Sequence, residues 1–540
     1  MTMDRRSLLK MIGAGALAVT AGGTLAGCGG GATKGAVGNS GKNLTPWPTY
    51  VPFAGPKPDL APEAKFGIQA GYLNYPQHLA TAVKDKVGDG SDVTAMVITY
   101  GTPPKPAEQN QLWAALNKAL GVNLKLVLVP DAEFQKKMAT VMASGDLPDI
   151  IMFGAGYYLS REQDFIQTQC ADLSDLIGGD HVKAYPNLAN IPAYSWQGMG
   201  RIGGKIYGIP TERPMPGNSL ILNRTAMDSA GVPRDWNADQ FLAGLKGYTS
   251  GKKYGIGAST SNFTGWASAA YHAGSFGAPN LWKVEGGKFI PTYETDQFRQ
   301  ALEFMTKLPY YPDSLTTSAV DMKSLFYNQT VASMTDGFGA YAGTAAKVKD
   351  FTFDFALPYG KNPTPWQGNG RFGYVVFKKA PTDRLKLLLR VCDYLAAPFG
   401  STEYELCNFG VEGAHFTRGA DGGIVTTELA KTENITNLPV KYIAAAPQVI
   451  YFPGNPEATK RLHQWERDTL PRSVADPSNG LRSATWSTSG AQLDKVIGDG
   501  LAAVIFGRKS VSEWDAIVKD WKAKGGAKAA EEYATEHAAA

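Results

Sequence analysis

The sequence is poor in the residues and motifs that most metal and cofactor sites need. It has four cysteines and six histidines in 540 residues, and none forms a Cys-x-x-Cys or His-x-x-x-His pair. A phosphate-cradling Gly-x-x-x-x-Gly-Lys-Ser/Thr segment and a calcium-binding Asp-x-Asn/Asp-x-Asn/Asp-Gly loop are also missing. We therefore expect no metal and no cofactor, and we expect that the chain does not itself hydrolyse ATP.

A strong excess of positive charge is missing too. The formal net charge is +4, and three of the positive charges, Arg5, Arg6 and Lys10, lie in the first ten residues. No basic stripe stands out elsewhere, so we expect no nucleic-acid partner. Three cysteines remain besides Cys28, and a disulfide between Cys392 and Cys407 stays open because connectivity cannot be deduced from sequence.

The first 28 residues have the three parts of an export signal: a charged start, a short Gly/Ala-rich apolar stretch and a small-residue cleavage site. The arginines before Leu8-Leu9-Lys10 resemble the twin-arginine (Tat) pattern, with ordinary secretory export as the alternative. Leu25-Ala-Gly-Cys28 resembles a bacterial lipobox, in which the cysteine is lipidated. We predict a signal peptide over 1–27 and a membrane lipid anchor on Cys28. The protein would then lie outside the cytoplasm, on the outer face of the cytoplasmic membrane.

Residues 28–60 are rich in Gly and Pro and predict a flexible tether, which leaves about 480 residues, enough for two lobes. A β-branched run predicts a strand over 92–100, and leucines at helical spacing predict a helix from Glu108 to Gly121. A second strand over 122–129, a helix capped by Asp131 and a third strand ending at Phe153 follow. This β-α-β order predicts parallel strands and an α/β lobe.

Ligands in such sheets bind beyond the carboxyl ends of the strands. Tyr100 and Tyr157 fall at two of those ends, so both are candidate ligand-binding residues, with ordinary surface loops as the alternative. At the C-terminus Ser510 and Glu513 form a capping box, and tryptophans at helical spacing follow it. We expect those tryptophans, Trp514 and Trp521, to anchor helix packing rather than to bind ligand.

An ordered series of motifs then resembles the bacterial extracellular solute-binding proteins, family 1, the sugar-capturing parts of ABC importers. Each motif alone is weak, but their order and spacing extend over nearly the whole mature chain, as in the large lipoprotein branch of the family. The motifs are residues 143–150, 171–177, 204–210, 222–224, 293–296, 332–337, 410–413 and 507–514.

The resemblance implies a periplasmic-binding-protein-like fold of type II: two α/β lobes joined by a hinge, with the ligand cleft between them. We place the N-terminal lobe at 61–210 and 358–396 and the C-terminal lobe at 211–357 and 397–540. Residues 208–210, 355–359 and 393–398 are the candidate crossings between the lobes.

The same resemblance implies ligand-binding residues, chosen because sugars stack on aromatic planes and bond to acids and arginines. Glu212 and Arg213 follow the first crossing, with a mutual surface salt bridge as their alternative. For the tryptophans the alternative is core packing. Relatives often carry Trp in the turn at 336–341, and its absence here leaves the stacking residue open. The remaining candidates are Trp266, Asp336, Phe338, Tyr341, Trp366, Glu412 and Trp486, with His415 beside Glu412.

The resemblance therefore implies a substrate-binding lipoprotein that captures a carbohydrate, closes over it and delivers it to an ABC permease. We expect a monomer that makes and breaks no bonds. Two alternatives stay open. Glu212, Asp336 and Glu412 carry the carboxylates that a glycosidase would need, which keeps an exported carbohydrate-active enzyme in view. A binding protein for a peptide or another polar solute is the other.

Overall fold

The computed structural model describes residues 38–154, 156–157, 159–258, 269–312 and 322–539. The predicted signal peptide, Cys28 and Trp266 therefore lie outside the described residues. In the described part no helix is long and apolar enough to cross a lipid bilayer.

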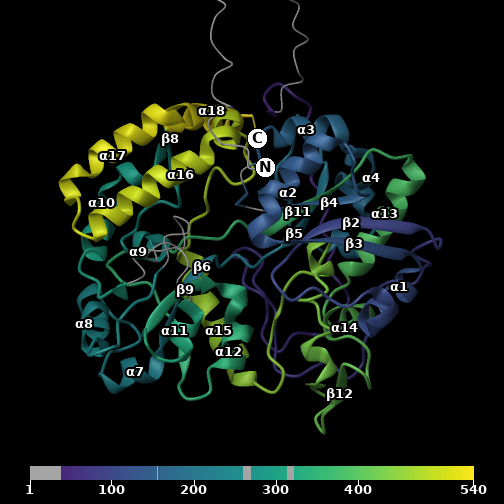
Figure 1. Cartoon of the computed structure of the whole chain (residues 1–540), viewed down its shortest axis with the longest axis horizontal. Coiled ribbons are helices and arrows are strands. Elements are labelled where there is room, and N and C mark those ends of the chain that lie inside the picture. The colour runs from purple at the N-terminus through teal and green to yellow at the C-terminus, as the bar shows by residue number, and fades with distance from the viewer. Residues whose placement is uncertain (1–37, 155, 158, 259–268, 313–321, 540) are drawn as a thin grey trace, which may run out of the picture. The chain divides into compact units, whose positions relative to one another are not determined.

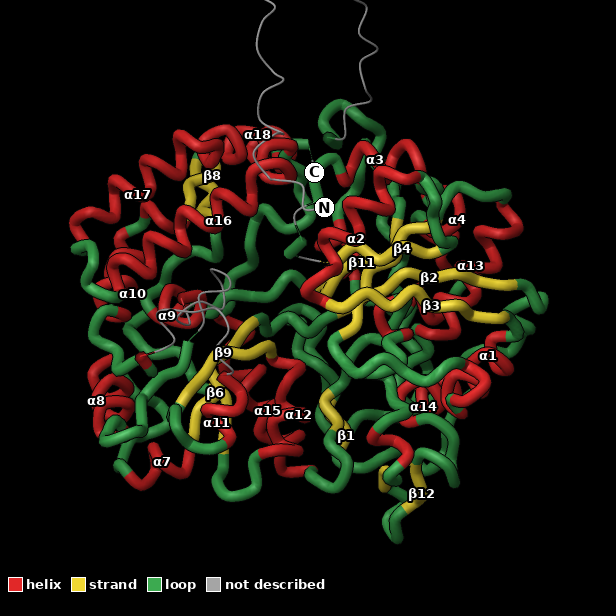
Figure 2. The backbone as a smooth tube through the Cα atoms, viewed as in Figure 1, coloured by secondary structure: helices red, strands yellow, loops and turns green. Residues whose placement is uncertain are grey.

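The largest sheet has five strands in the order β3-β2-β4-β11-β5, and Figures 1 and 2 show β3, β2, β4 and β11 beside one another. Strand β2 pairs in parallel with β3 and β4, whereas β11 runs antiparallel to both β4 and β5. Strand β5 therefore points the same way as β2, β3 and β4. The strands are β2 (Asp92–Thr99), β3 (Asn123–Pro130), β4 (Ile150–Gly154), β5 (Gly208–Glu212) and β11 (Arg371–Phe377).

The predicted β-α-β unit is confirmed, with its helix α1 at Gln111–Leu120. Asn110, not Glu108, begins this helix: its side chain accepts a hydrogen bond from the Trp113 amide at 2.9 Å. Gly121 ends the helix with φ 61°, a left-handed conformation that glycine adopts without strain. The three leucines of the predicted face are fully buried.

Helix α2 (Asp131–Ser144) confirms the second predicted helix but not its cap. Pro130 holds the capping position, and Asp131 is the first helical residue and makes no capping bond. Its carboxylate still lies at the positive end of the helix dipole. Phe134, Met138 and Val141 bury the predicted face.

The first hydrophobic core surrounds this sheet and draws on residues 87–209 and 374–444. Residues 393–398, predicted as a crossing strand, instead form the end of helix α13 and the turn after it, because the leucine-rich run from Leu385 is buried at helical spacing. The other helices in these segments are α3 (Glu162–Gln169), α4 (Ser174–Ile177), α5 (Pro186–Ala189), α6 (Ala193–Met199), α13 (Thr382–Leu395) and α14 (Thr402–Phe409).

A three-stranded antiparallel sheet, in the order β10-β6-β9, lies among the remaining helices (Figure 1). Two more cores flank it, one of helices α8–α10 and α16–α18 and one that includes α15. These strands are β6 (Asn218–Asn223), β9 (Ser333–Gly337) and β10 (Phe353–Phe355), with a hairpin of β7 (Trp282–Glu285) and β8 (Lys288–Pro291). The helices are α7 (Arg224–Ser229), α8 (Ala238–Tyr248), α9 (Ala269–Ser275), α10 (Asp296–Met305), α11 (Met322–Tyr327), α12 (Tyr341–Lys347), α15 (Pro456–Thr469), α16 (Ala484–Ile505), α17 (Trp514–Trp521) and α18 (Ala527–His537).

The C-terminal prediction is confirmed. The Ser510–Glu513 capping box is formed, and helix α17 follows it. Trp514 is fully buried, stacks on Phe298 at 5.5 Å and donates its indole N–H to the Tyr293 carbonyl at 2.9 Å. The tryptophans of this helix are packing anchors, as predicted.

Residues 397–444, which the sequence places in the C-terminal lobe, pack with the first core. Cys407 and residues 438–444 belong to that core, and Phe399 and Phe416 form a small fourth core with Tyr72. Two strand pairs lie here: β1 (Gly71–Tyr72) with β14 (Ile450–Tyr451), and β12 (Phe416–Arg418) with β13 (Ile424–Thr426). The sequence left a disulfide between Cys392 and Cys407 open. Both cysteines are buried free thiols in the structure, so this disulfide is not formed.

Residues 45–51, which belong to the segment expected to be a flexible tether, instead lie along the first core. The Thr45 and Val51 amides each donate to backbone carbonyls of that core at 2.8 Å. The Trp47 ring packs against it, 3.8 Å below the Arg201 guanidinium. Proline and glycine content indicated a loop correctly, but these contacts hold the loop in place.

Candidate functional site

The strand directions of the five-stranded sheet bring five chain segments to one edge. The carboxyl ends of β2, β3, β4 and β5 meet there, and antiparallel β11 begins there. Tyr100, Asp131, Tyr157 and Arg213 each lie within three residues of a strand end, and Phe372 lies at the start of β11. Tyr100 and Tyr157 lie at the two strand ends where the sequence places them, and their contact with a ligand stays a prediction.

Three aromatic rings and two cations gather at this edge, and we call Tyr100, Arg213, Phe372, Lys441 and Tyr442 the edge cluster. Phe372 and Tyr442 stack at 4.8 Å, and the Tyr100 ring meets both edge-on at 6.2 Å. The Arg213 guanidinium lies 4.8 Å from the Phe372 ring centre, and the Lys441 ammonium lies 5.3 Å from that of Tyr442. Tyr100 is 53% exposed, so the cluster presents an aromatic face to solvent.

Asp131 and Tyr157 stand beside the edge cluster. The Tyr157 hydroxyl donates a hydrogen bond to the Asp131 carboxylate, and its ring packs 4.9 Å from Phe134. Burial and the neighbouring Asp131 raise the pKa of Tyr157 above its usual value. Tyr157 therefore stays a neutral hydroxyl that can exchange hydrogen bonds.

The two cations of the edge cluster are partly buried, and burial lowers the pKa of each. Burial lowers the pKa of Arg213, which still keeps its charge at neutral pH. Burial, with the like charge of Arg213, lowers the pKa of Lys441 to about 8. The Lys441 ammonium is therefore mostly protonated at pH 7 but close to its titration.

The carboxylate of Glu212 and the guanidinium of Arg213, both in the described part of the chain, do not form an ion pair with each other. It accepts hydrogen bonds from the Tyr194 hydroxyl at 2.6 Å and the Gln448 amide at 2.9 Å, whereas Arg213 donates to the Glu212 backbone carbonyl at 2.9 Å. Neither the predicted surface salt bridge nor an exposed acid is present, because Glu212 is only 1% exposed.

A second buried acid, Glu466, lies near Glu212. It accepts from the Gln69 amide at 2.8 Å, and its Oε1 has no hydrogen-bond partner among the described residues. Burial raises the pKa of Glu212 to about 7, and burial with the nearby charge of Glu212 raises that of Glu466 to about 8. The two carboxyl groups therefore hold protons at a pH where exposed carboxyls are ionised.

Phe338 and Tyr341, predicted to stack on a ligand, are core residues in this structure. Phe338 packs against Phe355 at 5.1 Å and Trp465 at 5.4 Å and is 5% exposed. Tyr341 is 2% exposed. These rings present no open face here, because the antiparallel sheet and helix α15 cover them. Ligand contact by either ring stays a prediction that this packing does not favour.

In the described part of the chain, none of the remaining candidate residues contacts the edge cluster. Asp336 pairs with Lys323 at 3.0 Å, and the exposed Glu412 lies 3.4 Å from Arg418. Trp366 and Trp486 are partly buried against the second core. The Trp366 indole donates to the Ala278 carbonyl at 2.9 Å, and the Trp486 ring lies 6.3 Å from that of Tyr533. His415 is fully buried and accepts from the Val411 amide at 3.1 Å.

Sequence reasoning missed Phe372, Lys441 and Tyr442. A signal existed for Phe372, which begins a strand-like run just after Gly368-Asn-Gly370. The segment Gly368–Gly373 also fits a Gly-x-Gly-x-x-Gly pattern, but it leads into strand β11 rather than a helix N-terminus, so it lacks the dinucleotide-binding context. Lys441 and Tyr442 lie in the short helix η8 (Val440–Tyr442), and no motif marks them.

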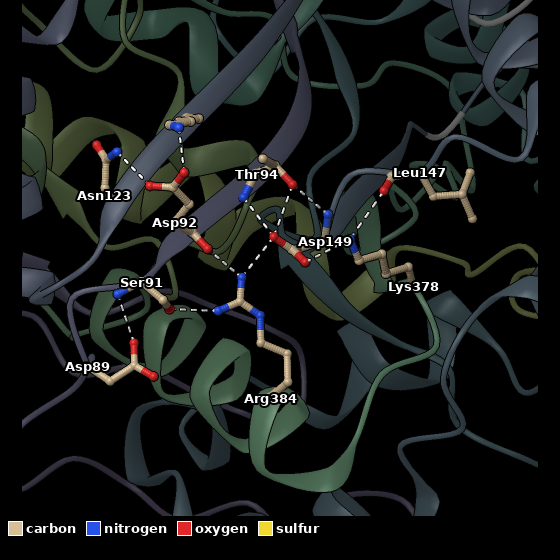
Figure 3. Close-up of polar contacts among 10 residues, drawn as sticks. Asp89, Ser91, Asp92, Thr94, Asn123, Leu147, Asp149, Lys378 and Arg384 are labelled. Carbon is tan, nitrogen blue, oxygen red and sulfur yellow. Dashed lines mark hydrogen bonds and ion pairs between the residues drawn. The ribbon is translucent and has the colours of Figure 1, made fainter.

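At the opposite edge of the same sheet, charged side chains of the chain pair with one another. Asp149, just before β4, accepts hydrogen bonds from the Thr94 amide and hydroxyl at 2.9 and 3.0 Å. It also pairs with Lys378 at 3.1 Å and Arg384 at 2.9 Å (Figure 3). Burial alone would raise the pKa of Asp149, but these hydrogen bonds and cations hold it below its ordinary value. Because its charged side chains pair with one another, this edge of the sheet has a structural role.

Over the described residues, no three His, Cys, Asp or Glu side chains gather closely enough to hold a metal ion.

Known proteins resemble this chain over most of its length. A family model described as bacterial extracellular solute-binding protein matches residues 100–392. The polygalacturonan/rhamnogalacturonan-binding protein YtcQ of Bacillus subtilis (strain 168) is 25% identical over 495 residues, covering 86% of this chain and 95% of that protein. Lipoprotein LipO of the same organism is 25% identical over 461 residues, covering 79% and 88%.

A solved structure has the same fold. An HMO-binding, ABC-transporter-associated solute-binding protein from Bifidobacterium longum infantis ATCC 15697 aligns with a TM-score of 0.61 at 11% identity, over 84% of this chain and 99% of that one. The predicted periplasmic-binding-protein-like α/β fold is confirmed.

Proposed function

Because this chain belongs to the bacterial extracellular solute-binding proteins, we propose that it captures a carbohydrate outside the cytoplasm and delivers it to the permease of an ABC importer. The relatives support this function: one is named for binding polygalacturonan and rhamnogalacturonan, and one solved structure is named an HMO-binding, ABC-transporter-associated solute-binding protein.

The edge cluster carries the proposal. A sugar ring offers C–H groups on its faces and hydroxyls at its rim, and a site for it combines apolar planes with a few oriented polar groups. The exposed Tyr100 ring provides such a plane, with Phe372 and Tyr442 beside it. Arg213 and the Tyr157 hydroxyl, at the same edge of the sheet, provide polar groups for the hydroxyls of the rim. The cluster also occupies the position where open α/β sheets bind ligands, beyond the carboxyl ends of the parallel strands.

The proposed mechanism is closure of two lobes over the ligand. Sugar bound by both lobes stabilises the closed form by its higher affinity for that form. We extend the first segment of the first lobe to residue 212, where β5 ends, and begin its second segment at residue 371, where β11 begins. Residues 213–370 belong to the second lobe, because Tyr359 and Trp366 pack with the second core. We move 397–444 to the first lobe, because Cys407 and residues 438–444 pack in its core. The second lobe then ends with residues 445–540.

We also propose that Cys28 carries a lipid that anchors a monomer to the outer face of the membrane, after twin-arginine export. The lipoprotein LipO, 25% identical, supports the anchor. Metabolic labelling with a palmitate analogue tests it: the wild type should incorporate label and Cys28→Ala should not. Labelling of both proteins would contradict the anchor.

Calorimetric titration of the mature protein with a panel of oligosaccharides and peptides tests the function. We expect an oligosaccharide to bind, and Tyr100→Ala to weaken that binding at least tenfold. Tyr50→Ala is the matched control, because Tyr50 is 49% exposed and lies on a different surface segment. Binding of peptides alone would refute the carbohydrate assignment.

The proposal also holds that the chain does no bond chemistry. Chromatography of the oligosaccharides after long incubation with the protein should show them intact. Released products would favour a carbohydrate-active enzyme instead.

A further inference from the structure

The two cations of the edge cluster have no counter-anion among the residues that the structure describes. Arg213 donates to a backbone carbonyl and lies over Phe372, and Lys441 lies over Tyr442. Neither forms an ion pair with any described residue. The nearby carboxylates have other partners: Glu212 accepts from Tyr194 and the Gln448 amide, and Asp131 accepts from Tyr157.

This arrangement is unfavourable until an anion arrives. Partial burial removes water from both cations, and cation–π contacts replace only part of that hydration. The repulsion between them adds to the cost, as the lowered pKa of Lys441 indicates. An anionic group placed against both cations would offset the desolvation and the repulsion together.

The opposite edge of the same sheet shows what such a partner does. There a lysine and an arginine, Lys378 and Arg384, also approach one strand end, and the chain provides Asp149 between them (Figure 3). At the edge cluster the two cations lie against the Phe372 and Tyr442 rings of the proposed binding site, and no carboxylate of the described chain pairs with them. The ligand is the remaining source of the anion.

We propose that the edge cluster binds an acidic carbohydrate, with its anionic group against Arg213 and Lys441 and its sugar ring on Tyr100. The anion is a uronate carboxylate or a sulfate ester, since both present oxygen acceptors to a guanidinium and an ammonium. This inference rests on the proposed function and narrows its substrate class.

Pairs of acidic and neutral ligands of equal length test whether the site prefers an anionic sugar. The mature protein is titrated by calorimetry at pH 7 and 0.15 M salt with oligogalacturonates, oligomannuronates and sulfated galactan oligomers. Each is compared with a neutral counterpart of equal length: the methyl esters of the two uronates and the unsulfated galactan. We expect at least one acidic ligand to bind at least tenfold more tightly than its counterpart, and the preferred pair distinguishes carboxylate from sulfate.

Substitution then locates the effect. Lys441→Met keeps the length and apolar stem of the side chain, and it should reduce the preference for the acidic ligand to threefold or less while the thermal midpoint is retained. Lys118→Met, at an exposed position of helix α1, is the control and should leave the preference unchanged.

Three results would overturn the inference: neutral ligands that bind as tightly as acidic ones, no binding by any acidic ligand, or a preference that survives Lys441→Met. Binding of neutral sugars alone would leave the proposed function standing. The absence of all carbohydrate binding would remove the function as well.

Discussion

Replacing Glu212 with Gln should remove a specific part of the pH dependence of stability. Burial raises the pKa of Glu212 from 4.5 to about 7, so the folded protein retains a proton that the unfolded chain releases. The stabilisation is fully present below about pH 4.5 and is lost as the pH rises through 7. In Glu212→Gln the amide oxygen still accepts from the Gln448 amide, and the amide nitrogen can donate to Tyr194, so both hydrogen bonds remain available.

The magnitude follows from the two pKa values. Between pH 5 and pH 8 the ionisation of Glu212 should cost the wild type about 2.5 kcal/mol of its free energy of unfolding. Buried acids that do not interact with Glu212 titrate alike in both proteins and cancel in the comparison. Glu466 does not cancel, because the charge of Glu212 raises its pKa in the wild type only, and this adds to the difference in the same direction. The difference between wild type and variant should therefore change by at least about 2.5 kcal/mol, in favour of the variant, as the pH rises.

Urea denaturation at pH 5, 6, 7 and 8, followed by tryptophan fluorescence, measures this difference. The exposed residue Glu108 provides a control, because Glu108→Gln should follow the wild type at every pH. Parallel pH profiles for Glu212→Gln and the wild type would refute the reasoning, since they would mean that the folded protein does not hold the extra proton at Glu212.

Three further predictions concern single side chains. Trp514→Ala should lower the free energy of unfolding by about 3–5 kcal/mol in denaturant titration, because it empties a fully buried site; a loss below about 1 kcal/mol would contradict that packing. Asp149→Asn should cost about 3 kcal/mol, because it leaves Lys378 and Arg384 unpaired near a buried position, and an unchanged denaturation midpoint would contradict it. Binding of an acidic oligosaccharide at pH 8 should take up about half a proton at Lys441, whose pKa lies near 8 beside Arg213, and calorimetry in two buffers of different ionisation enthalpy would detect zero uptake if this is wrong.

The local elements near the start of the sheet could be predicted because local sequence determines them. Periodic leucines, β-branched runs and Gly121 gave the β-α-β unit, and the Ser510–Glu513 box gave the start of the last helices. The strand ends then placed Tyr100 and Tyr157 at one edge, since parallel strands end together.

The rest of the site depends on contacts between distant segments, which no local pattern encodes. Tyr442 reaches Phe372 across about 70 residues of sequence, and Lys441 comes with it only through the short helix η8. The sequence could not show the burial of Phe338 either: its motif marks a strand and turn correctly, but Phe355 and Trp465 cover the ring. The sequence likewise predicted a tether over residues 38–60, because no local pattern shows that the Trp47 ring packs against the first core.

Strand β11 lies between β4 and β5, although more than 150 residues separate it from β5 along the chain. Without Arg371–Phe377 the sheet would be two separate pieces, and the edges of β4 and β5 that pair with β11 would have unpaired amide and carbonyl groups. A shortened chain that stops before residue 371 would expose both edges to pairing with other molecules. Any attempt to prepare the first lobe alone must therefore carry this late segment with it, spliced in rather than left off.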